Sequence, residues 1–187
     1  MIDTTGTEFH GDTLEWQSNL EQLKTCPRPL HTWLSEPGLL TARLALLAKR
    51  DLRVEIINQE ACLLDSQLLR QFSCQSPQAI ARRVLLKNNT EDWVIAETLI
   101  PLALWESTRW LNQLGTKPLG QALLGAGVTE LSHFEFAEVS AQSSLGQLTN
   151  VGAGQQLFAR RRWHQINNAR ILIQEVFLPA LIEKILP

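Results

Sequence analysis

The stretch IARRVLLKNNTEDWVIAETLI, residues 80–100, decides the fold. Its two halves, 80–87 and 93–100, are dominated by aliphatic and β-branched residues, which favour β-strands. Five polar residues, NNTED at 88–92, connect the halves, and a connector of this kind is typical of a β-hairpin. Pro101 ends the second half because proline cannot donate a hydrogen bond to a strand ladder. The stretch therefore predicts two antiparallel strands.

Strand patterns continue on both sides of this hairpin. Apolar residues alternate with polar ones, or run together, in four further segments: 52–64, 132–139, 157–166 and 169–179. A short polar turn, Asn167-Asn168, joins the last two of them. Since turns or loops join these strands, and regular strand–helix–strand units do not, the pattern predicts one antiparallel sheet.

Helical patterns lie between and around the strand segments. Leu40, Leu44 and Leu47 recur on one helical face within the region 32–50, which Pro37-Gly38 interrupts. Further helices are predicted at 13–24, 102–115, 117–125 and 178–187, and a loop at 140–156, which is poor in apolar residues. We therefore expect an α+β fold, a single antiparallel β-sheet with helices on one face, and one domain spanning 1–187.

The composition is that of a folded, soluble domain. Hydrophobic residues make up 44% of the 187 residues and charged residues 19%, which excludes a disordered chain. The net charge of −2 leaves no basic excess for contacts with nucleic-acid phosphates. The N-terminus is acidic and polar, and no run approaches the roughly 20 apolar residues that cross a bilayer. We therefore expect a cytoplasmic protein that neither binds nucleic acid nor inserts into a membrane.

The usual sequence motifs of metal, nucleotide and nucleophile chemistry are missing. The cysteines, Cys26, Cys62 and Cys74, show no CxxC spacing, and no two of the four histidines stand two or four residues apart. No GxGxxG, P-loop, HExxH or GxSxG pattern occurs. The residues thus predict free, mostly buried thiols, no metal and no cofactor.

Glu175 is the first residue that the fold alone does not explain. In ILIQEVFLP it shares a strand face with Ile173 and Phe177, and the opposite face of this strand is also largely apolar. A carboxylate in such a strand is costly unless it is paired, protonated or faces a cavity. Two interpretations stay open: a structural ion pair, or a carboxylate that belongs to a binding site.

Two neighbouring arginines raise the same question. Arg82 and Arg83 point to opposite faces of one strand, so one guanidinium must share a face with core residues. A buried guanidinium needs a planar anion, either a protein carboxylate or a substrate carboxylate. In the simplest arrangement Arg82 pairs with Glu175 or Glu97 and has no other role. The run Arg160–Arg162 predicts a solvated or anion-attracting face.

At these same segments the sequence resembles the chorismate pyruvate-lyase (chorismate lyase) family. The matching stretches, in the family's order and spacing, are PGLLTARL (37–44), ARRVLL (81–86), WVIAETLIP (93–101), LNQLGTKPLGQALL (111–124), LFARRRW (157–163) and ILIQEVFLP (171–179). LGTKPLG and EVFLP are the most specific of them. The resemblance implies a single antiparallel sheet with helical flaps over a buried ligand site.

The resemblance also implies an activity. Members of this family cleave chorismate to 4-hydroxybenzoate and pyruvate, the first committed step of ubiquinone biosynthesis. Loss of the enolpyruvyl group aromatises the ring, so the driving force lies in the substrate and no cofactor is needed. The protein would act by orientation and electrostatic stabilisation. We expect a monomer whose partners are chorismate and the product 4-hydroxybenzoate.

The family's functional positions can be carried over one by one. Arg82 stands at the arginine that grips the ring carboxylate, and Glu175 at the glutamate that hydrogen-bonds the hydroxyl group. These two are the expected catalytic residues, and both bind substrate. Leu40 and Leu119 stand on the flap segments and would contact the ligand mainly through their backbone amides. Closure of the flaps would strengthen these interactions by excluding water.

One position departs from the family's pattern. WVIAETLIP has Glu97 where the family more usually shows an arginine, a natural partner for the pyruvyl carboxylate of chorismate. Either Arg83 or the run Arg160–Arg162 replaces this positive charge, or Glu97 points away from the ligand. The alternative function is a non-catalytic small-molecule sensor of the same fold, as in the effector-binding domains of certain bacterial transcription regulators.

Overall fold

The computed structural model describes residues 8–9, 14–49, 51–130, 132–149, 151–152 and 154–186. The strands are β1 (Glu8–Phe9), β2 (Arg53–Leu64), β3 (Gln78–Lys87), β4 (Asp92–Pro101), β5 (Thr129–Glu130), β6 (Glu135–Val139), β7 (Leu157–Ile166) and β8 (Ala169–Phe177). The α-helices are α1 (Arg28–Leu34), α2 (Leu40–Leu47), α3 (Ser66–Phe72), α4 (Leu102–Ser107), α5 (Arg109–Asn112), α6 (Leu119–Gly125), α7 (Ser144–Gln147) and α8 (Pro179–Ile185).

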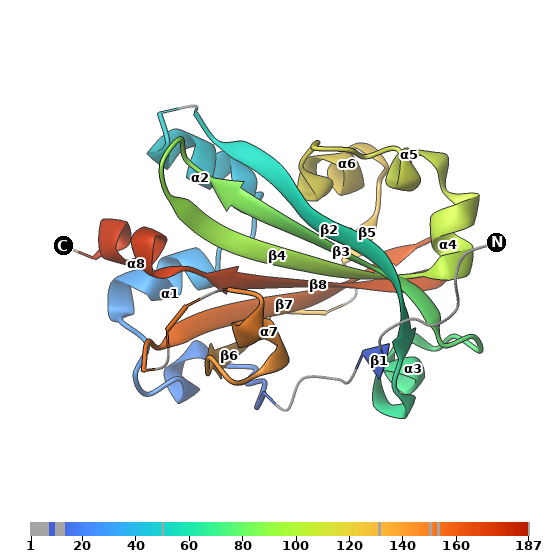
Figure 1. Ribbon diagram of the computed structural model, residues 1–187, viewed down its shortest axis with the longest axis horizontal. Coiled ribbons are helices and arrows are strands. Elements are labelled where there is room, and N and C mark those ends of the chain that lie inside the picture. Colours follow the sequence, from blue (N-terminus) through green and yellow to red (C-terminus); the bar gives the residue numbers. More distant parts are fainter. Residues whose placement is uncertain are drawn as a thin grey trace.

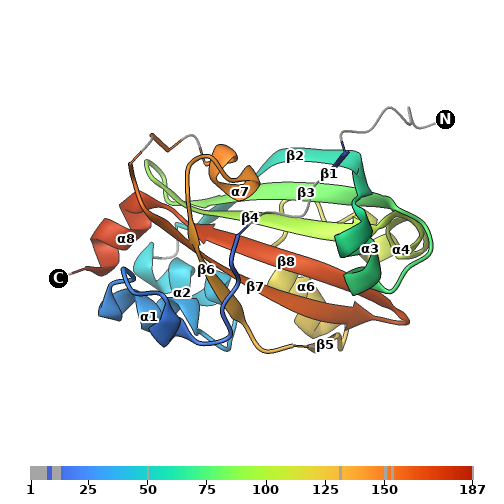
Figure 2. The ribbon, with the colours of Figure 1, turned by 90° about the horizontal axis from the view of Figure 1, so that it is seen from below.

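One sheet organises these elements. Its strand order is β1-β2-β3-β4-β8-β7-β5, and β6 pairs with β7 on the same side as β5. Figure 2 shows β2, β3, β4, β8 and β7 side by side in that order. Every pairing is antiparallel except that of the two-residue β1 with β2. The predicted α+β fold, the hairpin at residues 80–100 and the strand pair at the C-terminus are confirmed.

Helices cover both faces of the sheet unequally. On one face, α1, α2 and α8 pack near one end and α4, α5 and α6 near the other, as Figure 1 shows. On the opposite face, Leu68 and Phe72 of α3 pack against Leu99 and Leu172. The short α7 packs on that face too, through Leu145. The helices predicted within 32–50, 102–115, 117–125 and 178–187 are present on one face, and the short helices α3 and α7 on the other face add to them.

Two local predictions are wrong. No α-helix forms between 14 and 24, and the only helical turn there is a 3-10 turn at Leu20–Gln22; Thr13 lies outside the described residues. The leucines of this segment serve different clusters, because Leu14 packs beside α7 whereas Leu23 packs with α1 and α2. The predicted loop at 140–156 contains α7, which Ser143 caps by accepting a hydrogen bond from the Gly146 amide at 3.1 Å.

The structure also tests the expectations of free, mostly buried cysteines and of no membrane-spanning helix. All three cysteines are free, with Cys26 and Cys62 buried and Cys74 half-buried. Burial raises the pKa of Cys26 to about 12 and that of Cys62 to about 11, so both thiols stay protonated at neutral pH. None of the described helices is long and apolar enough to cross a bilayer.

Candidate functional site

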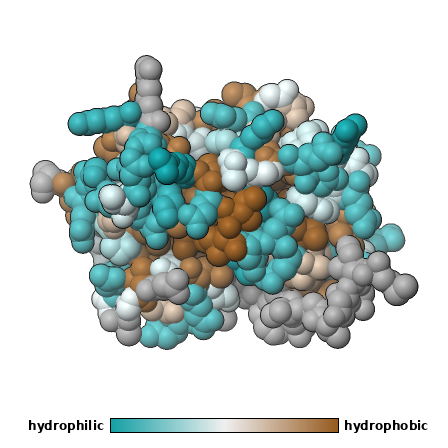
Figure 3. Space-filling model, turned by 45° about the horizontal axis from the view of Figure 1, so that its top comes forward, coloured by the Kyte–Doolittle hydropathy of each residue, from teal (hydrophilic) through white to brown (hydrophobic). Residues whose placement is uncertain are grey.

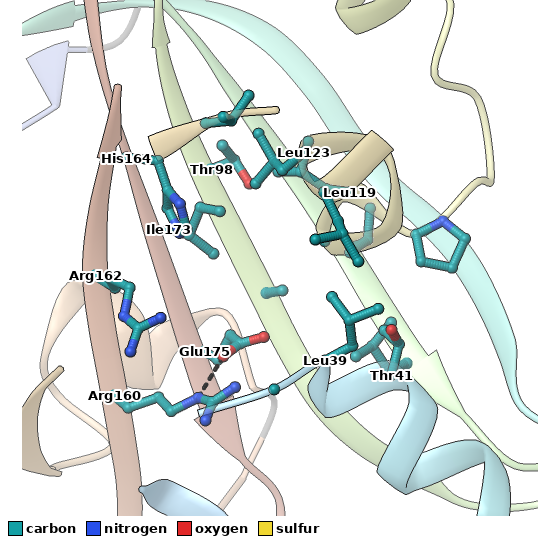
Figure 4. A pocket seen from close by; sticks show the side chains of 18 of the residues that line it. Leu39, Thr41, Thr98, Leu119, Leu123, Arg160, Arg162, His164, Ile173 and Glu175 are labelled. Atoms are coloured by element: carbon teal, nitrogen blue, oxygen red, sulfur yellow. Dashed lines mark hydrogen bonds and ion pairs between the residues drawn. The ribbon is translucent and has the colours of Figure 1, made fainter. Parts of the chain in front are cut away.

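A cavity of about 260 Å³ lies between the sheet and the first turns of α2 and α6. Leu39 and Thr41 line it from the side of α2, and Leu119 and Leu123 from the side of α6 (Figure 4). Figure 3 shows hydrophobic surface near the middle of the side on which α2, β2 and α6 lie. A concave, largely apolar space with a few polar groups is the usual form of a small-molecule site.

The strand register sets the order of the polar groups on the cavity floor. Side chains of residues paired across neighbouring strands lie in a row on one face of a sheet. The first row consists of Arg82, Thr98, Ile173 and Arg162, and the second of Val84, Ala96, Glu175 and Arg160. Both rows cross β3, β4, β8 and β7, so the functional groups come from strands that are far apart in the sequence.

Arg82 is buried, and no carboxylate of the described residues pairs with it. Its side chain is 2% exposed, and its NH2 group donates a 2.6 Å hydrogen bond to the backbone carbonyl of Gly115. Its Nε atom is buried and has no hydrogen-bond partner among the described residues. Desolvation by burial lowers the pKa of Arg82. The simplest pairing expected from the sequence, with Glu175 or Glu97, is wrong, because each of these carboxylates pairs with another arginine.

Glu175 pairs with Arg160 on the neighbouring strand. The Nε of Arg160 donates to a carboxylate oxygen of Glu175 at 2.5 Å, and Figure 4 shows this pair at the cavity. The NH1 group of Arg160 donates to the carbonyls of Leu34 and Glu36 at 3.2 and 3.0 Å, at the C-terminal end of α1. Glu175 is thus ion-paired, as the first interpretation expected, and it also lines the cavity. That it binds a ligand stays a prediction.

The strand β7 brings further polar groups to the cavity, of which the sequence offered only the run Arg160–Arg162, as one alternative source of positive charge. Arg160, Arg162 and His164 alternate along β7 and line the cavity together. The Nε of Arg162, the Nδ1 of His164 and the hydroxyl of Thr41 are buried without a hydrogen-bond partner in the described part of the chain. Period-two counting along FARRRWHQI places these three β7 residues on the face of Phe158, so the signal was present in the sequence.

The two predicted flap residues, Leu40 and Leu119, each begin a helix. Leu40 is the first residue of α2 and Leu119 the first of α6, so both backbone amides belong to the helix turn that lacks internal partners. Neither helix has a side-chain cap at its N-terminus. The Leu119 side chain lines the cavity, whereas that of Leu40 is 3% exposed and packs in the core. That the flaps move, and that these amides bind a ligand, stay predictions.

Gly120 lets the two flap segments approach each other. A Cβ atom built on Gly120 would lie 3.0 Å from the Cδ2 of Leu39. Figure 4 shows the Leu39 and Leu119 side chains pointing toward each other from the two helices. These leucines therefore form one side of the cavity.

Glu97 lies on the face of the sheet opposite the cavity. It accepts a 2.7 Å hydrogen bond from the Nε of Arg83 and a 3.2 Å bond from the side chain of Gln174. These residues belong to one polar row that crosses six strands: Asn58, Arg83, Glu97, Gln174, Arg161 and Glu135. Glu97 therefore points away from the cavity, which agrees with the alternative in which it does not face the ligand.

The described residues contain no group of three or more His, Cys, Asp or Glu side chains placed to hold a metal ion. The cavity instead gathers three guanidinium groups, of Arg82, Arg160 and Arg162, against two carboxylates, of Glu130 and Glu175. A pocket with this excess of positive charge favours an anionic ligand.

Comparisons with known proteins match nearly the whole chain to chorismate lyases. A family model described as chorismate lyase matches residues 12–186. A relative from Shewanella sp. (strain MR-4), named "Probable chorismate pyruvate-lyase", is 31% identical over 191 residues, which is 97% of this chain and 96% of the relative. One of the same name from Psychromonas ingrahamii is 30% identical over 183 residues, 96% of this chain and 97% of the relative.

Solved structures share the fold at much lower identity. A transcriptional regulator of the GntR family from Bacillus cereus superposes with a TM-score of 0.52 at 11% identity, over 70% of this chain and 93% of the other. The effector domain of PhnF from Mycobacterium smegmatis superposes with a TM-score of 0.51 at 12% identity, over 69% of this chain and 82% of the other. These likenesses show that the sheet and its helices form an arrangement also found in those proteins, and they show the fold alone.

Proposed function

Since the chain belongs to the chorismate lyase family, we propose that it cleaves chorismate into 4-hydroxybenzoate and pyruvate. The reaction takes place in the cavity between the sheet and the N-termini of α2 and α6. Arg82, Glu175, Leu40 and Leu119 are its proposed functional residues, as the resemblance implied.

One observation carries this proposal: Arg82 is buried at the floor of the cavity and contacts no carboxylate in the described part of the chain. An uncompensated buried charge destabilises a protein by several kcal/mol. A ligand carboxylate that binds Arg82 through two parallel hydrogen bonds would remove this cost. The backbone amides of Leu40 and Leu119, at two uncapped helix N-termini, supply further donors for the same anion.

Glu175 is suited to hold the hydroxyl group of the ring. Arg160 keeps the Glu175 carboxylate in place through its Nε, while its own NH1 is fixed by backbone carbonyls at the end of α1. A carboxylate held in this way has a second oxygen that can accept a hydrogen bond from a ligand hydroxyl. We therefore assign Arg160 as a positioning residue that acts through Glu175.

The reaction needs no proton from outside the substrate. The bond between the ring carbon and the enolpyruvyl oxygen breaks, and the hydrogen on the carbon that bears the hydroxyl passes to the enolpyruvyl methylene. The methylene becomes the methyl group of pyruvate, its oxygen becomes the keto group, and the ring becomes aromatic. The protein contributes by holding one reactive conformer and by stabilising the negative charge that develops on the departing oxygen.

The test is a product assay on the purified protein with chorismate in the presence of a metal chelator. Equimolar 4-hydroxybenzoate and pyruvate are expected, formed faster than in the absence of protein. Tight binding of 4-hydroxybenzoate without any turnover would instead support the sensor function and overturn the lyase. A role in ubiquinone biosynthesis, a cytoplasmic location and a monomeric state remain predictions from the sequence and the resemblance.

A further inference from the structure

We propose that Arg162 binds the second carboxylate of the substrate, at the opposite end of the cavity floor from Arg82, and that Glu130 is the counterion this carboxylate displaces. This inference rests on the proposed function, because it assigns the enolpyruvyl carboxylate of chorismate to a residue. It also answers a question that the sequence raised, since Glu97, where an arginine is usual in the family, faces away from the cavity.

The position of Arg162 is set by the strand register. Arg82 pairs with Thr98, Thr98 with Ile173, and Ile173 with Arg162, so the two arginines end one row across four adjacent strands. Three strand spacings separate their backbones by roughly 14 Å. Both arginines line the cavity, and Thr98 and Ile173 lie between them in the row. The remaining space between the guanidinium groups suits a small ligand with an anion at each end.

The surroundings of Arg162 leave part of its guanidinium group without a partner. Its NH1 is paired with Glu130, whose side chain is 54% exposed, whereas the Arg162 side chain is 11% exposed. Its Nε is buried and has no hydrogen-bond partner among the described residues. An ion pair with an exposed carboxylate is weak, so a buried ligand carboxylate competes with it readily. The Nε and NH1 of Arg160, by contrast, donate to Glu175 and to backbone carbonyls.

An aromatic ring holds Arg162 in this orientation. The guanidinium carbon lies 3.6 Å from the centroid of the Phe134 ring, and that of Arg160 lies 4.3 Å from the same centroid. Such cation–π contacts fix the plane of the guanidinium group and leave its edge free to donate. Phe134 and both arginines line the cavity. A guanidinium fixed in this way loses little conformational entropy when it binds a carboxylate.

The arrangement of groups in chorismate fits these positions. In chorismate the hydroxyl and the enolpyruvyl ether stand on adjacent ring carbons, so the groups that hold them must also be neighbours. Glu175 and Arg162 lie on adjacent strands in neighbouring rows of the floor. When Glu175 holds the hydroxyl and Arg82 the ring carboxylate, the enolpyruvyl carboxylate is directed to the Arg162 end. The product 4-hydroxybenzoate has no second carboxylate, so it loses this contact.

The experiment compares the two ligands in the variant Arg162→Gln. We expect the KM for chorismate to rise by about 10- to 100-fold, the loss typical of a hydrogen bond to a charged group. The Kd of 4-hydroxybenzoate, measured by calorimetry, should change by less than about threefold, which also shows that the pocket is folded. Arg162→Lys, which keeps the charge but not the planar fork, should give an intermediate KM.

Arg161→Gln is the matched control. Arg161 is the next residue of the same strand, but it faces the opposite side and pairs with Glu135, so its loss should leave both ligand affinities unchanged. An unchanged KM in Arg162→Gln, or an equal loss of affinity for both ligands, would overturn the assignment. If the wild type does not turn chorismate over, its Kd for intact chorismate replaces KM. The role of Arg162 is then judged separately from the lyase activity.

Discussion

At the scale of single residues, the site depends on which polar groups are satisfied inside the protein and which are left for a ligand. Arg160 has a carboxylate and backbone carbonyls as partners, so it is a structural arginine that positions Glu175. Arg82 and Arg162 each keep a buried Nε that has no hydrogen-bond partner among the residues the structure describes. A bound anion would accept hydrogen bonds from these donors and so remove the free-energy cost of leaving them buried and unpaired. Relief of this cost would contribute to the affinity for a ligand with two carboxylates.

His164 makes the stability of the fold depend on pH. Burial, and then the nearby charge of Arg162, lower the pKa of His164 below its ordinary 6.5. Below about pH 6.5 the unfolded chain therefore binds a proton that the folded chain does not. As the pH is lowered, this residue decreases the free energy of unfolding by at most about 1.4 kcal/mol per pH unit. Urea denaturation between pH 8 and pH 5 measures this slope. In His164→Gln the slope should be smaller, and equal slopes in both proteins would contradict the prediction.

Part of this residue-scale account could be predicted from the sequence. Period-two counting showed that Arg82 and Arg83 face opposite ways and that Glu175 sits in an apolar strand. It could not assign the partners, because these depend on which strands are neighbours and on their register. β7 stands beside β8, so Glu175 meets Arg160; β3 stands beside β4, so Arg83 meets Glu97.

At the scale of elements, the strands and most helices were predictable from their hydrophobic patterns, whereas the segment 13–24 and the helices α3 and α7 were not. The strands at 157–166 and 169–179 and the helices around Pro37-Gly38 formed close to their predicted ranges. The helix α7 was missed because its segment, 140–156, is poor in apolar residues and was assigned to a loop. The segment of α3 was given no prediction. Both are fixed at their start by a capping side chain, Asp65 for α3 and Ser143 for α7.

The glycine in α7 is required by close packing. A Cβ atom on Gly146 would lie 1.9 Å from the carbonyl oxygen of Ser140, which is backbone and cannot move away easily. Gly146→Ala should therefore lower the free energy of unfolding by about 3 kcal/mol, the upper part of the range for overpacked sites. Gly125→Ala is the control, because its Cβ would meet no atom within 4 Å. Thermal and urea denaturation measure both, and wild-type stability in Gly146→Ala would refute this packing argument.

At the scale of the whole molecule, the sheet separates two sets of polar residues, one on each of its faces. The cavity face carries the groups assigned to the substrate, and the opposite face carries the row that contains Arg83 and Glu97. The resemblance identified the family and predicted roles for Arg82 and Glu175, but it could not place Glu97. Its side depends on the alternation along β4, where Thr98 faces the cavity and Glu97 faces away.

The pair of Arg83 and Glu97 should affect stability and not chemistry. Glu97→Arg alone brings two guanidinium groups together at a site where Glu97 is 1% exposed, and it should cost about 3–5 kcal/mol of unfolding free energy. Adding Arg83→Glu restores opposite charges and should recover part of this loss, giving a favourable coupling energy in a double-mutant cycle. The turnover number per folded molecule should stay near wild type. No recovery in the double variant would argue against a direct pair.

The measurement that tests the central claim most directly is the kcat/KM for chorismate of the wild type and of Arg82→Ala, assayed together by quantifying both products. We expect equimolar 4-hydroxybenzoate and pyruvate from the wild type, and a kcat/KM lower by about 100- to 1,000-fold in the variant, the loss typical of a group that stabilises charge in the transition state. Arg109→Ala, which removes an exposed arginine of α5, should match the wild type. Wild-type kinetics in a folded Arg82→Ala would place the chemistry elsewhere, and no turnover by the wild type would contradict the proposed function itself.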